Sequence, residues 1–500
     1  MTRDIFDKER LSPELDSYIR DSNPWWEGKP GPVLPEFRRW AFHTTLRKLA
    51  SGLAPVVVLR GPRQVGKTTL QQQIIHHLIS EKNVKPSHIL RLQFDEIPSL
   101  RDVKEPVLSL ARWFENRILR TTFNEAAGAG EPAYLFFDEV QNLRDWAPQL
   151  KALVDQHSVK VLVTGSSALR IELGRDSLAG RITTIELGTL LLREVAGLRF
   201  HESLKPHLPE NGLEPLLDKE FWRGLQSYGH KERDIRNKAF EAFSARGGYP
   251  MAQAMANVPW PEVADQLNET VVKRAIQHDL RMGQRGIKRD AQLLEEVFRL
   301  ACRYAGQSPG QAIFTHEIRQ ALSGNIGWQR ILAYLRFLDA ALLIRLVNPL
   351  ELRLKRTRGN HKLCLCDHGL RASWLQELVP LDEPGLARAP HLHDLAGHIA
   401  ESVAGYFLGG LPHLDLAHFP ERGAEPEVDF ILTVGERRIP LEIKYRLRID
   451  PFRDTLGLRA FIEKSVYNAP FGVLVTLRDD VVIDDPRIIP VSLPSLLLMR

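Results

Sequence analysis

Residues 56–70 read VVVLRGPRQVGKTTL, and this stretch decides the fold of the first part of the chain. Its short β-branched run predicts a buried strand, and the residues after Lys67 continue with helical character. Between the two, residues 61–68 match the pattern G-x-x-x-x-G-K-[ST] of a phosphate-binding loop. A strand, a glycine-rich loop and a helix N-terminus in this order predict a site for the phosphate groups of a nucleotide.

The residue types in this loop match the chemistry of phosphate binding. The glycines let successive backbone N–H groups turn inward around the β-phosphate. Lys67 supplies positive charge to the β- and γ-phosphates, and the Thr68 hydroxyl can ligate Mg²⁺. We therefore expect ATP and Mg²⁺ as cofactors. The expected nucleotide-binding residues are Gly61, Pro62, Arg63, Gln64, Val65, Gly66, Lys67, Thr68 and Thr69.

The second half of the expected nucleotide site lies in residues 134–139, which read YLFFDE. An apolar strand that ends in two carboxylates is the Walker B arrangement. Asp138 is expected to hold Mg²⁺ through water, so Asp138 and Thr68 are the predicted metal ligands at this site. Glu139 is expected to orient or deprotonate the attacking water, which makes it a predicted catalytic residue.

The next strand-like run, VKVLVTGS at residues 159–166, ends in polar side chains. Ser166, or as a weaker choice Thr164, is expected to contact the γ-phosphate; the alternative is a serine that only caps a turn. Arg175 and Arg181 follow in the sequence GRDSLAGR. Either arginine could stabilise transition-state charge, in cis or across a subunit contact, and we select Arg181 as the catalytic one.

A second group of charged residues lies in residues 427–445, which read EVDFILTVGERRIPLEIKY. Two strand-like runs flank a Gly-Glu turn, so a hairpin would bring Asp429 and Glu442 together at one end. Glu442 and Lys444 are two residues apart and therefore share one face of a strand. Glu401, in an expected helix upstream, could add a third carboxylate.

Carboxylates beside a lysine can bind a divalent cation, activate a water and stabilise a pentavalent phosphate. We therefore predict Glu401, Asp429 and Glu442 as ligands of a second Mg²⁺ or Mn²⁺. Glu442 and Lys444 are the predicted catalytic residues of phosphodiester cleavage. The alternative interpretation is that these charges form the solvated face of surface strands.

The middle of the chain carries a pattern typical of DNA-binding modules. Residues 315–335 predict two short helices around a Ser-Gly-Asn turn, the first opening with Thr315 as N-cap. An apparent hairpin follows, as in a winged helix-turn-helix. This hairpin carries one acid, Glu351, against the basic residues Arg353, Lys355, Arg356, Arg358 and Lys362. The excess of positive charge favours contact with DNA phosphates; the alternatives are a protein contact or a solvated face.

Strand-like and helical stretches alternate from Pro55 to about residue 200, which predicts βαβ units around a parallel sheet. Together with the motifs above, these patterns predict an α/β protein with a P-loop NTPase domain, a mainly helical region, a winged helix-turn-helix and a C-terminal αβββαβ domain of the restriction-endonuclease-like type. The family resemblance given below implies that the first domain is AAA+-like and that the helical region is its lid. The expected segments are a lead-in at 1–50, the ATPase domain at 51–200, the lid at 201–300, the winged helix at 301–380 and the nuclease-like domain at 381–500.

The composition of the 500 residues is that of a globular protein, because 43% are hydrophobic and 26% are charged. The net charge of +5 permits a nucleic-acid partner without requiring one. No apolar run reaches the roughly 18 residues that span a membrane, and the first residues lack the pattern of a secretory signal. We expect a cytoplasmic protein with no membrane partner, whose three cysteines are reduced and packed.

These motifs, in this order, resemble a family of prokaryotic AAA+-type P-loop ATPases. The family carries a winged helix and a C-terminal PD-(D/E)xK nuclease-like domain of unknown function. The resemblance covers nearly the whole chain and rests on LRGPRQVGKTTL, YLFFDEVQ, TGSSALRIELGRDSLAGR, ARGGYP and EVDFIL followed by IPLEIKYR. It implies a nucleotide site at Lys67, Thr68, Asp138 and Glu139, with Arg181 as the arginine of the SLAGR segment.

Two further segments bear on this resemblance. Asp367 in CDHGL looks like the acid of the family's D-x-G-L signature, and we interpret it as a helix-capping residue. The stretch ELGTLLLREV, which follows Arg181, departs from the family's proline-containing L-x-P-L-S pattern. This departure weakens the inference about the lid and leaves the phosphate site unaffected.

Two functions from different classes fit the sequence. The first is an ATP-gated enzyme that acts on DNA and cuts it at the C-terminal carboxylates. The second is a non-cleaving ATP/ADP switch whose winged-helix and nuclease-like domains only bind DNA or a protein partner. A metabolic kinase fits poorly, because no small-molecule pocket signature follows the Walker motifs. Whether the chain forms a homo-oligomer stays open at this point.

Overall fold

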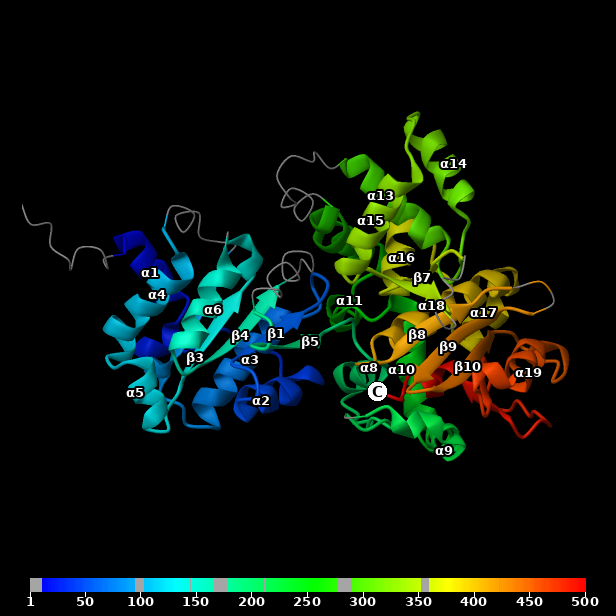
Figure 1. The fold of residues 1–500 in the computed structure, drawn as a ribbon, viewed down its shortest axis with the longest axis horizontal. Coiled ribbons are helices and arrows are strands. Elements are labelled where there is room, and N and C mark those ends of the chain that lie inside the picture. The colour runs from blue at the N-terminus through cyan, green and yellow to red at the C-terminus, as the bar shows by residue number, and fades with distance from the viewer. Residues whose placement is uncertain are drawn as a thin grey trace, which may run out of the picture. The chain divides into compact units, whose positions relative to one another are not determined.

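The chain divides into two units, Met1–Leu187 and Gly188–Arg500, in the computed structural model (Figure 1). The structure describes residues 11–94, 103–143, 145–165, 178–210, 212–276, 290–351, 359–421, 423 and 425–500. Ser166 and Arg175 lie outside these residues, as do Arg353, Lys355, Arg356 and Arg358 of the predicted basic hairpin.

The first unit, drawn from blue to cyan in Figure 1, contains a five-stranded sheet in the order β2-β3-β4-β1-β5. The strands are β1 (Val56–Arg60), β2 (Ile89–Gln93), β3 (Ala133–Asp138), β4 (Val159–Gly165) and β5 (Ile182–Glu186). Every pairing is parallel. The α/β class and the parallel P-loop sheet that the alternating runs predicted are therefore confirmed.

Strands β1, β2, β3 and β4 are mostly buried because helices pack against the sheet, as continuous apolar runs in a parallel sheet require. In β1, Val56, Val57, Val58 and Leu59 are each at most 1% exposed. The α-helices that the structure describes in this unit are α1 (Pro13–Asp21), α2 (Ala41–Ser51), α3 (Lys67–Ser80), α4 (Pro106–Phe114), α5 (Phe123–Gly128) and α6 (Trp146–Gln156). Helices α2 and α3 contact the central strands, α2 touching β1 and both touching β4.

The lead-in segment has a structural role at the edge of this sheet. Asn23 accepts a hydrogen bond from the Arg91 amide (2.7 Å) and donates one to the Arg91 carbonyl (2.9 Å), in the pattern of a neighbouring strand. The Trp26 indole donates to the Ile89 carbonyl at 2.8 Å. These contacts satisfy the outer backbone groups of edge strand β2, which would otherwise be free to pair with another chain.

The second unit contains a seven-stranded sheet in the order β12-β11-β10-β9-β8-β6-β7. Its strands are β6 (Ile344–Pro349), β7 (Lys362–Leu365), β8 (Asp415–Phe419), β9 (Val428–Val434), β10 (Arg437–Lys444), β11 (Gly472–Thr476) and β12 (Ile488–Ser492). Strands β9 and β10 form the expected antiparallel hairpin, and β11 pairs with β10 in parallel. Helix α18 (His393–Gly409) precedes β8, and helix α19 (Leu456–Glu463) connects β10 to β11.

The remaining helices of this unit follow the chain in two groups. Those of the expected lid region are α8 (Leu192–Phe200), α9 (Lys219–Lys231), α10 (Arg233–Arg246), α11 (Pro250–Ala254) and α12 (Trp260–Leu267). Those that follow are α13 (Ala291–Arg303), α14 (Gln311–Leu322), α15 (Trp328–Ala340), α16 (His368–Leu375), α17 (Glu383–Arg388) and α20 (Leu493–Leu496). None of the helices in the described ranges has the length and apolar character needed to cross a membrane.

The hairpin β6–β7 extends the C-terminal sheet. Strand β6 pairs with β7 on one side and with β8 on the other, where Asn348 lies opposite Ala417. The segments predicted as 301–380 and 381–500 therefore share one sheet. One local prediction is wrong: α14 begins at Gln311, and the Thr315 hydroxyl donates to the Gln311 carbonyl at 2.8 Å, inside the helix.

Two other predictions about single residues are confirmed. Asp367 is the N-cap of α16 and accepts a hydrogen bond from the Leu370 amide at 2.9 Å. It also accepts one from the Gly248 amide, so the ARGGYP segment is tied to this cap. Cys302, Cys364 and Cys366 are all free thiols and all buried.

Candidate functional site

The phosphate loop connects β1 to α3 and depends on two glycines. Gly66 is the N-cap of α3 with φ 92°, a left-handed conformation that glycine adopts without strain. A Cβ atom at Gly61 would collide with the carbonyl oxygen of Leu187, so a larger residue does not fit there. The loop backbone is thus held against the end of β5, and the first turn of α3 points its free N–H groups into the loop.

Lys67 lies inside this loop. Its side chain is 5% exposed, and Nζ donates to the carbonyl oxygens of Gly61 (2.9 Å) and Pro62 (2.7 Å). The Arg39 guanidinium, which the sequence did not single out, donates to the Val65 carbonyl at 2.7 Å. The ammonium of Lys67 is therefore positioned by the loop that would surround the phosphates.

Asp138 lies at the end of β3, beside the phosphate loop. Its Oδ2 accepts a hydrogen bond from the Thr68 hydroxyl at 2.8 Å, and its Oδ1 accepts one from the Thr164 hydroxyl. The side chain is fully buried, and this burial raises the pKa of its carboxyl. A hydroxyl and a carboxylate side by side are hard oxygen ligands, so the residues present fit Mg²⁺.

Glu139 follows directly after β3 and is partly exposed. Its backbone is left-handed, with φ 50° and ψ 40°, which is uncommon for a residue with a side chain. The Gln141 amide donates to its Oε2. This turn directs the chain away from the sheet immediately after the Walker B strand, and such conformations occur at functional sites more often than elsewhere.

The structure adds side chains that sequence reasoning missed. Arg91 on β2 approaches Asp138, with Nη2 3.5 Å from Oδ2, and donates to Gln93 Oε1 at 2.7 Å. Gln93 lies directly opposite Asp138 in the register of β2 and β3. The sequence signal that could have indicated Arg91 is its position as a single arginine within the mostly apolar strand ILRLQ. Thr164, the weaker choice for a γ-phosphate contact, is the residue that touches Walker B.

Arg181 lies away from this group of residues. It directly precedes β5, its carbonyl accepts a hydrogen bond from Val56 N at 3.1 Å, and its guanidinium pairs with Asp155. It is therefore at the amino ends of β1 and β5, whereas the phosphate loop is at their carboxyl ends. Five strand residues span roughly 17 Å. Arg181 does not reach the nucleotide site of its own unit, and a role across a subunit contact stays a prediction.

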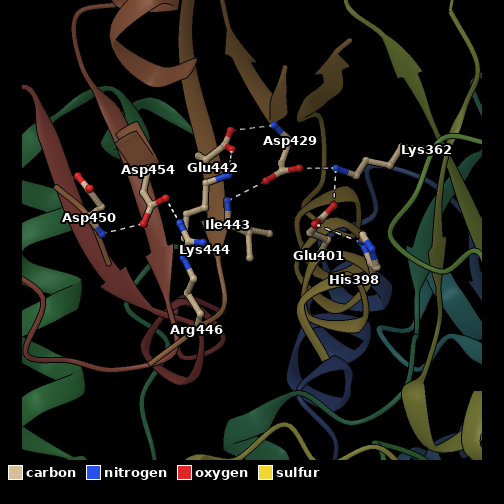
Figure 2. A network of polar contacts seen from close by, with 10 residues as sticks. All are labelled: Lys362, His398, Glu401, Asp429, Glu442, Ile443, Lys444, Arg446, Asp450 and Asp454. Atoms are coloured by element: carbon tan, nitrogen blue, oxygen red, sulfur yellow. Dashed lines mark hydrogen bonds and ion pairs between the residues drawn. The ribbon is translucent and has the colours of Figure 1, made fainter. Parts of the chain in front are cut away.

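The second unit brings the C-terminal charges together, as Figure 2 shows. Asp429 Oδ2 accepts a hydrogen bond from the Ile443 amide at 2.8 Å, and the Asp429 amide donates to Glu442 Oε2 at 3.4 Å. Lys444 Nζ donates to Glu442 Oε1 at 2.6 Å. The predicted convergence of Asp429, Glu442 and Lys444 at one end of the β9–β10 hairpin is what the structure has.

Lys362 enters the same cluster from strand β7. Its Nζ lies 2.6 Å from Asp429 Oδ1 and 2.7 Å from Glu401 Oε2, and 5.0 Å from the centre of the Phe430 ring. The side chain is 2% exposed. The interpretation of Lys362 as part of a phosphate-binding surface is therefore wrong, because this lysine is buried between two carboxylates.

The electrostatics of the cluster follow from this placement. Burial alone would raise the pKa of Asp429, but the Lys362 ammonium outweighs it and holds that pKa below its usual range. Burial, together with the charge of Asp429, raises the pKa of Glu442 to about 8. Burial and the same charge also raise the pKa of Glu401.

The three predicted ligands of a second metal ion do not fit one in this arrangement. Asp429 and Glu401 face the ammonium of Lys362, and Glu442 faces Lys444. In the part of the chain that the structure describes, no group of three or more His, Cys, Asp or Glu side chains is arranged to hold a metal ion.

Comparison with known proteins gives two family matches along the chain. Residues 54–196 match the family described as "AAA domain", and residues 237–379 match a domain of unknown function, DUF8612. The chain is 34% identical over 116 residues to the uncharacterized protein MJ1637 of Methanocaldococcus jannaschii, which is 23% of this chain and 22% of that protein. It is 27% identical over 190 residues to the uncharacterized protein Rv2008c of Mycobacterium tuberculosis, 36% of each chain.

The chain thus spans about a fifth and about a third of the length of these two curated relatives. An uncharacterized protein of Haemophilus influenzae is 24% identical over 322 residues, which cover 63% of this chain and 68% of the relative.

Solved structures give a weaker likeness. The Walker-type ATPase PABY2304 of Pyrococcus abyssi superposes with a TM-score of 0.42 at 14% identity, over 69% of this chain and 99% of the other. The ORC1 protein of Aeropyrum pernix, solved in complex with DNA, gives a TM-score of 0.28 at 13% identity, over 72% and 95%. The family match and the structure agree: residues 54–196 match an AAA-type domain, and the first unit has the parallel sheet and phosphate loop of a P-loop ATPase fold.

Proposed function

We propose that ATP binding and Mg²⁺-dependent hydrolysis in the first unit control how the second unit acts on DNA. The observation that carries the first half is the convergence of Lys67, Thr68 and Asp138 at one edge of the parallel sheet. The Thr68 hydroxyl lies 2.8 Å from the Asp138 carboxylate, although the two residues come from different elements.

Each side chain has a distinct task in this proposal. Lys67 binds the β- and γ-phosphate oxygens, and Thr68 and Asp138 hold Mg²⁺. Mg²⁺ bound there supplies positive charge to the phosphates during transfer. Glu139, at the open end of β3, orients the attacking water and accepts its proton. Thr164 and Arg91 position Asp138 through the contacts that they make with its carboxylate.

The chain leaves the ATPase unit directly over the phosphate loop, which supports coupling between the units. Leu187 N donates to the Arg60 carbonyl at 2.8 Å, and the Leu187 carbonyl lies against Gly61. The second unit begins at the next residue, Gly188. A change in the conformation of the phosphate loop on nucleotide binding would therefore change the position of Leu187, the residue that precedes the second unit.

Two features of the second unit support action on DNA. Glu442 and Lys444 lie together at the carboxyl end of β10, and the Lys444 side chain is 31% exposed. Beyond Lys444, the segment after β10 carries exposed Arg446, Arg448 and Arg453. Phe452 is 64% exposed, which is unusual for a large apolar residue, and the Arg459 guanidinium lies 4.4 Å from the centre of its ring. Arginines beside an exposed aromatic ring suit phosphates and unstacked bases.

Phosphodiester cleavage at this site is the activity that we propose for the second unit. Glu442 would activate the attacking water and Lys444 would stabilise the charge on the phosphate. The non-cleaving switch is the second candidate, and one observation favours it. Lys362 keeps Asp429 and Glu401 paired, so these two carboxylates are unavailable to other ligands in this conformation.

A cleavage assay tests the proposal. Labelled linear, branched and single-stranded DNA would be incubated with Mg²⁺ or Mn²⁺, with and without ATP. We expect Glu442→Ala to lower cleavage by about 100-fold or more, the usual cost of removing an acid–base group. We expect Lys67→Ala to remove the dependence on ATP. Absence of cutting by the wild type, with ATP hydrolysis intact, would contradict cleavage and support the switch.

A further inference from the structure

The carboxylate cluster already contains a cation, and the chain itself supplies it. Lys362 Nζ lies within 2.7 Å of an oxygen of both Asp429 and Glu401. These carboxylates come from β9 and α18, far along the chain from the lysine (Figure 2). The ammonium is fully buried, so its charge is balanced by these two groups and not by water.

The backbone around Lys362 is held in place on both sides. Leu363, the next residue of β7, accepts a hydrogen bond from Gly306 N at 2.7 Å and donates one to the Gln307 carbonyl at 3.0 Å. The Leu365 amide donates to the Ser402 hydroxyl on α18 at 2.8 Å. Strand β7 is therefore fixed against the helix that carries Glu401, which fixes the position of the lysine as well.

A divalent cation at these carboxylates would compete with the lysine for the same oxygen atoms. Mg²⁺ binds carboxylate oxygens at about 2.0–2.1 Å. An ion bound to the oxygens that contact Lys362 would then lie within about 5 Å of the ammonium, where two like charges repel strongly in a buried site. One cation must leave before the other can bind.

We propose that Lys362 is a built-in competitor of the metal ion: while its ammonium occupies Asp429 and Glu401, it excludes Mg²⁺ or Mn²⁺ from the cluster. Withdrawal of Lys362 from the cluster opens both carboxylates. The inference rests on the proposed function in one respect, since the site that Lys362 closes is the proposed site of DNA cleavage. The competition itself depends only on the geometry of the three side chains.

The test is Mn²⁺ binding without nucleotide, measured by calorimetry on the full chain. Lys362→Met keeps the length and apolar stem of the side chain and removes the charge. We expect this variant to bind Mn²⁺ at Asp429 and Glu401. The affinity of this site for Mn²⁺ should be at least about tenfold higher than in the wild type, because the competing charge is gone. Adding Asp429→Asn to Lys362→Met should abolish the gain, and Lys362→Arg, which keeps a cation, should behave like the wild type.

Thermal unfolding gives a second readout. Lys362→Met leaves two buried carboxylates without their partner, so we expect a lower Tm, and Mn²⁺ should raise this Tm by more than it raises the Tm of the wild type or of the double variant with Asp429→Asn. If Lys362→Met does not fold, a comparison of Mn²⁺ binding by the wild type and by Asp429→Asn still tests the proposal. Mn²⁺ binding by the wild type that Asp429→Asn weakens would overturn the proposal, and binding that Asp429→Asn leaves unchanged would support it.

Mn²⁺ binding and DNA cleavage, measured on the same variants, can give different outcomes. A Lys362→Met variant that binds Mn²⁺ through Asp429 but cuts no DNA supports the competition and contradicts cleavage. Wild-type protein that binds Mn²⁺ as tightly as Lys362→Met and cuts DNA overturns the competition and supports cleavage.

Discussion

Glu139→Gln should slow ATP turnover by about 10²–10⁴-fold, the usual contribution of a positioned general base. ATP should still bind, because Lys67, Thr68 and Asp138 keep their places in the phosphate loop and at the end of β3. The amide of glutamine has the size of the carboxyl group but cannot accept the proton of the attacking water. The measurement is steady-state phosphate release together with ATP affinity from a fluorescent analogue.

The matched control is Glu131→Gln. Glu131 precedes the same strand at its opposite end, where it pairs with Lys85 on the surface. The same chemical change there should leave turnover unaltered. Turnover by Glu139→Gln at the wild-type rate would mean that another group activates the water.

Lys67→Ala should remove most of the affinity for ATP. Lys67 is 5% exposed, and its ammonium is held by the loop carbonyls of Gly61 and Pro62. A charge pair at about 4 Å is worth about 4 kcal/mol at an effective dielectric constant of 20. Since each 1.4 kcal/mol is about tenfold in affinity, we expect a loss of at least about 100-fold after desolvation is counted.

Nucleotide titration calorimetry measures this loss. The control is Lys82→Ala, because Lys82 is exposed just beyond the opposite end of α3. That variant should bind ATP like the wild type. Equal affinities for Lys67→Ala and Lys82→Ala would exclude the phosphate loop as the nucleotide site.

The ATPase fold was predictable because its signals are local. Parallel strands buried on both faces have continuous apolar sequences. The run VVVLR coincides with β1, and the run YLFFD lies within β3. The phosphate loop fixes its own conformation through glycine positions. The parallel sheet then places Asp138 near Thr68, so the order of the two motifs along the chain was enough to predict that these side chains meet.

The residues that sequence reasoning misjudged depend on partners distant in sequence. Lys362 reads as an exposed charge in a basic hairpin, but Asp429, which pairs with it, comes 67 residues later. For the same reason, Arg91 and Arg39 were not singled out, since their partners Asp138 and Val65 also lie far along the chain. Thr315 resembled an N-cap, yet the preceding residues already form the helix, and a hydroxyl can bond within a helix as well as at its start.

The position of Arg181 was available from the sequence but was not used. Arg181 directly precedes the strand-like run ITTIE, so in a parallel sheet it lies at the edge opposite the loops that follow the strands. The register of β5 on β1, with Ile182 opposite Val56, places it at the amino end.

The central claim is that the nucleotide state of the first unit controls the engagement of DNA by the second. The most direct test is the affinity for a labelled DNA, by fluorescence anisotropy at fixed salt, of Glu139→Gln with ATP and with ADP. A coupling of this kind predicts dissociation constants that differ by about fivefold or more between the two states. Lys67→Ala should show no difference. Equal affinities of Glu139→Gln for DNA with ATP and with ADP would contradict the account.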